Sequence, residues 1–151
     1  MMAPMPRLDA SRVLAWRELQ SVTAELERLI DGDLRAEWDL PLGWFDVLAA
    51  LARLGGRARP VELAAALRLQ RSSLSRRLDR LQEEGWVARR ETVRPDDLRS
   101  IDVVLTGRGR RLWRETSIAY RRAVQRHFAG VLSDEEVHGL LETLERIAPS
   151  G

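Results

Sequence analysis

The stretch from Leu63 to Thr106 constrains the fold more than any other part of this chain, because several local signals follow one another within it. A basic segment, Arg71 to Glu84, has apolar residues at helical spacing, and Gly85 after it tolerates the positive φ of a helix end. Residues 86–90 and 100–105 have β-strand character and flank a polar loop, so they are expected to pair as a hairpin. The inward face of the basic helix is predicted to consist of Leu74, Leu78 and Leu81. Together with a short helix expected at 60–67, this order predicts a winged helix-turn-helix.

The first turns of the basic helix carry small hydroxyl side chains and arginines. These residue types suit a recognition helix, which meets base edges and phosphates. The predicted readers of base edges or phosphates are Ser72, Ser73, Ser75 and Arg76, and the predicted phosphate contacts are Arg71 and Arg77. The alternative is a solvated helix face whose arginines pair with neighbouring acidic residues. For Arg77 and Arg80 this alternative explains the sequence as well as DNA contact does.

Positive charge concentrates in the same part of the chain. Residues 57–99 hold 11 arginines and 7 acidic residues, a net charge of +4, whereas the whole protein has a net charge of only +2. Residues 1–56 are net negative, with 6 arginines and 9 acidic residues. This asymmetry favours a nucleic-acid partner for the central segment.

The residues of this segment closely resemble the MarR family of bacterial transcriptional regulators. The wing signature of that family, D-x-R-x-x-x-V-x-L-T, is met at every specified position from Asp97 to Thr106. The other matching residues are Leu63, Ala64, Arg76, Asp79, Arg80, Leu81 and Gly85. The resemblance extends over roughly Ala10 to Ala148. One departure is Gln70, which stands where many relatives carry a capping serine, so either Gln70 caps poorly or Ser72 caps the helix.

The resemblance also assigns roles in the wing. It implies that Arg99 enters the minor groove and that Asp97 holds the Arg99 guanidinium in place. Arg94 is a second candidate for DNA contact in the wing. The alternative for these residues is an ordinary solvated hairpin tip.

The fold expected from these observations is mainly α, with a small β-hairpin wing, in a single domain spanning residues 1–151. Residues 41–106 form the winged helix-turn-helix lobe, and residues 10–40 and 107–148 form dimerisation helices. The terminal helices carry more apolar surface than the lobe can cover, so a homodimer is expected, with its two recognition helices about one DNA turn apart. Ser133 and Glu136 predict a capping box for the last helix.

Large aromatic side chains suggest a site for an effector. In the family that the chain resembles, the first, second and fifth helices line a cleft that binds small aromatic or anionic compounds. The corresponding candidates here are Trp16, Trp44, Phe45 and Trp113. Each is also explained by simple core packing.

Several classes of function have no support in the sequence. The chain has no cysteine and only two histidines without ligand spacing, so no disulfide, thiolate chemistry, metal or other cofactor is expected. No catalytic constellation is present, which argues against an enzyme. The lack of a long apolar run argues against a membrane partner, and a cytoplasmic location is expected.

We therefore predict a cytoplasmic homodimer that binds a pseudo-palindromic operator in double-stranded DNA and represses adjacent genes or its own. A small aromatic or anionic ligand would relieve the repression. The alternatives are a ligand-independent regulator or activator, or a protein-interaction module that has lost DNA binding.

Overall fold

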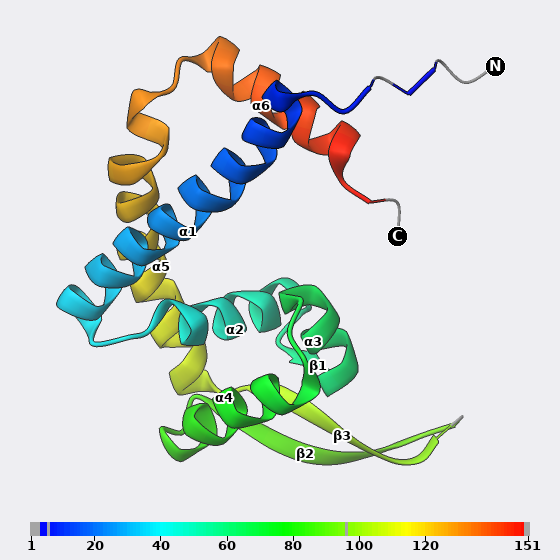
Figure 1. The fold of residues 1–151 in the computed structure, drawn as a ribbon. Helices are drawn as coiled ribbons and strands as arrows, with labels where there is room; N and C mark the ends of the chain where they lie inside the picture. The colour runs from blue at the N-terminus through cyan, green and yellow to red at the C-terminus, as the bar shows by residue number, and fades with distance from the viewer. Residues whose placement is uncertain (1–3, 6, 96, 150–151) are drawn as a thin grey trace.

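The computed structural model describes residues 4–5, 7–95 and 97–149. Two long helices cross above a small lobe of shorter helices and a narrow sheet (Figure 1). In chain order the elements are α1 (Ala10–Trp38), α2 (Leu42–Arg53), β1 (Arg57–Ala58), α3 (Pro60–Leu67), α4 (Arg71–Glu83), β2 (Val87–Arg94), β3 (Asp97–Leu105), α5 (Gly107–His127), the 3-10 helix η1 (Ala129–Val131) and α6 (Asp134–Ile147). The mainly helical fold with a β-hairpin wing is confirmed.

The lobe consists of α2, α3, α4 and the antiparallel sheet, whose strand order is β1-β3-β2. The predicted hairpin of β2 and β3 is confirmed, and the sheet has a third strand that was not foreseen. This strand, β1, pairs Arg57 with Val104 and Ala58 with Val103. The two long strands form the wing, residues 87–105, which projects from the lobe beyond α4 (Figure 1).

Leucines from three helices form the core of the lobe. On α4, Leu74, Leu78 and Leu81 are each 2% exposed or less, as predicted from their spacing. They pack with Leu48 of α2, Val103 of β3 and other buried side chains. Burying a leucine side chain stabilises a fold by about 1.5 to 3 kcal/mol, so this face holds α4 firmly and leaves its opposite face to solvent.

The stem consists of α1, α5 and α6. Helices α1 and α5 pack against each other, and Ile30 and Leu34 of α1 join Phe45 of α2 and Ala119 of α5 in a second core where stem and lobe meet. Helix α1 runs through Gly32 without interruption. All of α6 is described, and none of its residues is buried. One copy of the chain therefore leaves this end of the stem unpacked.

Among the residues that the structure describes, no helix is long and apolar enough to cross a membrane.

Candidate nucleic-acid interface

The solvent face of α4 carries most of the predicted DNA contacts. Arg71, Ser72, Ser75 and Arg76 are exposed, and Ser73 is half-buried. Within the described residues, neither the Arg71 nor the Arg76 side chain has a hydrogen bond or an ion pair, so both guanidinium groups are available to an external anion. Arg71 and Ser75 also line a groove of about 470 Å³ with Ser100 and Ile101 of β3. The fold thus brings the recognition helix and the wing onto one surface.

Unlike the side chains of Arg71 and Arg76, the side chain of Arg77 bonds to another part of the protein. Its guanidinium Nη1 donates a hydrogen bond to the carbonyl oxygen of Gly43, at 3.1 Å, at the start of α2. The group lies so close to Gly43 that a Cβ there would meet Arg77 Nη1 at 2.9 Å. In this structure Arg77 links α4 to α2, and its predicted contact with phosphate stays a prediction.

A side chain from the wing fixes the recognition helix from the other side. Arg89 of β2 donates to the side-chain oxygen of Gln82 at 3.0 Å and to the carbonyl oxygen of Ser75 at 3.3 Å. It also pairs with Asp79 at 2.9 Å. Arg89 was not predicted from the sequence, because an arginine in a strand resembles any other polar strand residue. Arg89 holds the wing and α4 in a defined relation.

At the far end of the wing, Arg99 is exposed, as a contact with the minor groove requires. The side chain of Asp97, which was predicted to hold Arg99, lies outside the described residues. The backbone of Asp97 pairs with Arg94 where β3 begins.

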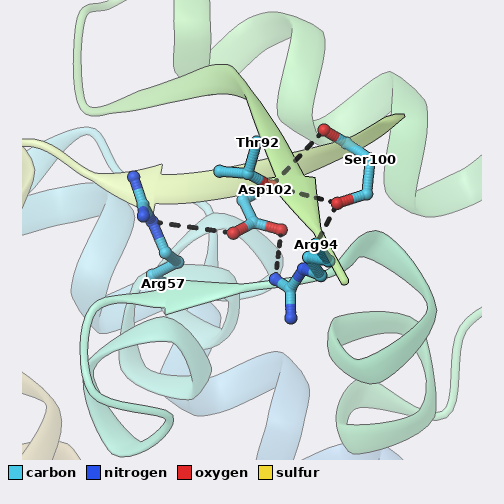
Figure 2. Close-up of polar contacts among 5 residues, drawn as sticks. All are labelled: Arg57, Thr92, Arg94, Ser100 and Asp102. Atoms are coloured by element: carbon cyan, nitrogen blue, oxygen red, sulfur yellow. Dashed lines mark hydrogen bonds and ion pairs between the residues drawn. The ribbon is translucent and has the colours of Figure 1, made fainter. Parts of the chain in front are cut away.

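Arg94 is held in a polar cluster that involves all three strands (Figure 2). Its Nη2 donates to Oδ1 of Asp102 at 2.7 Å, and its Nε donates to the hydroxyl of Ser100 at 3.2 Å. Asp102 is only 1% exposed, and its Oδ2 lies 3.7 Å from Nε of Arg57 on β1. Neither Arg57 nor Asp102 was predicted to have a role from the sequence.

Caps and turns set both ends of α4. Gln70 is the N-cap residue and makes no side-chain capping bond, which confirms that it caps poorly. At the other end Gly85 has a φ of +78°, as predicted, and its carbonyl oxygen accepts a hydrogen bond from the hydroxyl of Thr106 at 2.7 Å. The same hydroxyl accepts from the backbone N–H of Gly109 and caps α5. Thr106 therefore ties the end of the recognition helix to the stem.

A separate cavity of about 520 Å³ lies between α2 and α5. Of the four aromatic residues predicted to bind a ligand, Phe45 and Trp113 line it, and Trp16 and Trp44 do not. Trp44 instead packs edge-to-face on Trp86, with ring centroids 6.3 Å apart. Trp16 is 60% exposed on α1.

The wall of this α2/α5 cavity combines aromatic and charged groups. The rings of Phe45 and Tyr120 stack with centroids 4.6 Å apart, and Asp46 and Arg53 lie beside them. Burial raises the pKa of the Asp46 carboxyl, and the nearby Arg77 guanidinium offsets part of that rise. Asp46 also lines the cleft that contains Arg77, so it lies between the cavity and the recognition helix.

No group of three or more potential metal ligands occurs in the part of the chain that the structure describes.

An exposed basic helix beside a wing with an exposed arginine defines a protein of the winged helix-turn-helix class. Comparison with known proteins narrows the class further. Residues 38–99 match the model of the MarR family. The DNA complex of Sco3205, a MarR family transcriptional regulator from Streptomyces coelicolor, has 30% sequence identity and a TM-score of 0.82, covering 96% of this chain and 91% of that one.

Two other relatives support the same family. A mutant form of MarR from E. coli, in complex with operator DNA, has 28% identity and a TM-score of 0.78, covering 95% of this chain and all of that one. The transcriptional regulator PecS of Dickeya dadantii is 33% identical over 106 residues, 69% of this chain and 62% of PecS. The chain belongs to the MarR family. It is a transcriptional regulator and not an enzyme.

Proposed function

We propose that this protein is a cytoplasmic homodimer that binds a pseudo-palindromic operator in double-stranded DNA and represses adjacent genes or its own. The observation that carries the proposal is the shared surface of α4 and the wing, where Arg71 and Arg76 have no partner among the described residues. Both Sco3205 and E. coli MarR were crystallised with DNA, which supports the same partner here. Phosphate contacts position such a surface, and contacts to base edges give it specificity.

A DNA titration tests this proposal. Duplex DNA from the region upstream of the protein's own gene, labelled for fluorescence anisotropy, should bind with an affinity that falls as salt rises, because bound arginines release counterions. Arg76→Ala should weaken binding by about 1 to 3 kcal/mol. Arg7→Ala removes the same charge from an exposed position before α1, outside both the lobe and the proposed dimer helices, and is the matched control.

Equal loss in both variants would show a general effect of charge and would count against α4 as the DNA-reading element. DNA binding would be refuted if the wild-type protein bound neither this DNA nor any fragment from the genomic neighbourhood of its gene. That result would favour the protein-interaction module.

We also propose that residues 10–40 and 107–148 form the dimer interface and that residues 41–106 form the DNA-binding lobe. Helix α6 has no buried residue, although it presents a row of apolar side chains: Val137, Leu141, Leu144 and Ile147. On α1, Leu14, Trp16 and Val22 are also exposed, each 50% or more. A two-fold dimer that pairs these faces would bury them.

Sedimentation tests the interface. The protein should sediment at about twice 17.2 kDa at low micromolar concentration. Leu141→Arg, which places a charge in the proposed interface, should shift the mass towards one copy, whereas Val93→Arg at the exposed wing should not. A well-folded wild-type monomer would contradict the proposal.

The α2/α5 cavity is our proposed site for an effector that relieves repression. Its aromatic wall and the arginines Arg53, Arg114 and Arg121 favour a small aromatic anion. A ligand bound there would shift the population of lobe positions towards one that no longer fits the operator, by an amount limited by its differential affinity for the two states. A ligand-independent regulator is the alternative if the cavity binds nothing.

A further inference from the structure

Asp102 is a buried carboxylate in the wing that the proposed DNA contacts do not use. It is 1% exposed, on the face of β3 that carries the polar cluster of Figure 2. Burying a carboxylate is costly unless opposite charges and hydrogen bonds compensate. A side chain kept in such a place is therefore expected to determine the arrangement of its partners.

The partners of Asp102 come from both neighbouring strands. Arg94 of β2 donates to one carboxylate oxygen at 2.7 Å, and Arg57 of β1 lies 3.7 Å from the other. Arg94 is also fixed through its Nε, which donates to Ser100 of β3. One carboxylate on the central strand β3 thus connects the two edge strands, β1 and β2.

The regular pairing of β2 and β3 is interrupted beside the polar cluster, at Arg94. The register of β2 and β3 shifts between Thr92 and Arg94, and a shift of this kind bends a strand and leaves a backbone group unpaired. A two-stranded hairpin is only marginally stable by itself. The side-chain contacts of Asp102 supply a fixed point immediately before the wing tip and the exposed Arg99.

We propose that Asp102 is a positioning residue for DNA binding: it holds Arg94 and sets the direction of the wing tip, without itself touching DNA. This proposal rests on the proposed function of the wing as a DNA contact. Asp102 is buried, so it can act on DNA only through the groups that it holds.

A simple charge argument predicts the opposite effect of its removal. Taking a negative charge from a DNA-binding lobe weakens the repulsion of phosphates and should tighten binding. If Asp102 positions the wing, Asp102→Asn should instead weaken binding, because asparagine lacks the charge that holds Arg94. The loss of charge and the loss of positioning therefore change the affinity for DNA in opposite directions.

The experiment compares Asp102→Asn with Glu83→Gln, which removes one negative charge from an exposed position on α4. Fluorescence anisotropy with the upstream DNA should show binding about fivefold weaker or more for Asp102→Asn, and unchanged or tighter for Glu83→Gln. Tighter binding by Asp102→Asn would overturn the proposal.

A double-mutant cycle separates positioning from loss of fold. Arg94→Gln breaks the same ion pair from the other side, and it should weaken DNA binding in a similar way. If Asp102 acts through Arg94, adding Asp102→Asn to Arg94→Gln should cause little further loss, whereas independent effects would multiply. Full additivity would overturn the proposal.

Hydrogen exchange supplies a readout that needs no DNA. Asp102→Asn should speed the exchange of backbone amides in residues 91–94 and 97–100 and leave those of α4 unchanged, because only the wing loses its fixed point. Unchanged exchange in the wing, or faster exchange throughout the lobe, would refute the positioning role. If wild-type protein bound no DNA, the proposed function would fail, and exchange would still decide whether Asp102 holds the wing.

Discussion

The side chains predicted to contact DNA differ in what else they touch. Arg71 and Arg76 have no polar partner among the described residues, whereas Arg77 bonds to Gly43 and Arg94 to Asp102. A guanidinium without a protein partner can bind phosphate at no cost in broken contacts, and one already bound must first exchange partners. At the residue scale, Arg71, Arg76 and the exposed Arg99 are therefore the strongest candidates for direct contact.

Arg99→Ala should weaken operator binding by about 1 to 3 kcal/mol per protomer and leave folding intact, because an exposed wing arginine contributes to the interface and little to the core. Asp97→Ala should cause a smaller loss of the same kind. Anisotropy at matched salt measures both, and circular dichroism checks the fold. Unchanged affinity of Arg99→Ala would remove Arg99 from the interface.

Asp46→Asn should stabilise the protein at neutral pH. Burial raises the pKa of Asp46 above its ordinary value of 3.8, so the folded state binds the proton more tightly than the unfolded state. The stability of the wild type must then fall as pH rises through the folded pKa, and asparagine does not share that fall. Urea unfolding at a series of pH values should show the advantage of the variant growing from acid to neutral pH. A constant difference would contradict the assignment.

At the scale of elements, one close contact connects the junction of α4 and β2 to the stem. A Cβ at Gly109, in the first turn of α5, would overlap the backbone carbonyl of Trp86, which cannot give way as a side chain can. Gly109→Ala should therefore push α5 away from the end of α4 and lower the melting temperature. Gly139→Ala, where a Cβ meets nothing within 4 Å, is the control and should preserve or raise it. Equal melting temperatures would show that the contact relaxes freely.

The elements that the sequence predicted best are those with local causes. The bounds of α3, the capping box of α6 and the positive φ of Gly85 follow from proline, cap residues and glycine close by in the chain. Strand β1 was missed because two residues have no periodicity, and it exists only by pairing with Val103 and Val104. The Arg57–Arg94–Asp102 cluster was missed for the same reason, since its members meet only after the sheet has formed.

At the scale of the whole molecule, neighbouring residues of α2 connect the α2/α5 cavity to the recognition helix. Phe45 belongs to the core between stem and lobe and also lines the α2/α5 cavity, and Asp46 lies between that cavity and Arg77 of α4. A ligand that displaces these groups must act on both the lobe and its junction with the stem. This arrangement supports coupling between effector binding and DNA binding. Of the four aromatic residues predicted to bind the effector, Phe45 and Trp113 alone line the cavity.

An aromatic anion such as benzoate should therefore quench the fluorescence of Trp113 and loosen DNA binding over the same range of concentration. Both effects report one binding event, so Trp113→Phe should lose the quenching, and Trp16→Phe, which alters an indole outside the cavity, should keep it. Linkage requires that saturating DNA weaken benzoate binding by the same factor, typically about 5- to 150-fold for a coupling of 1 to 3 kcal/mol. Quenching of Trp113 without any change in DNA affinity would mean that the cavity binds ligands but does not regulate, and the ligand-independent regulator would then be the better description.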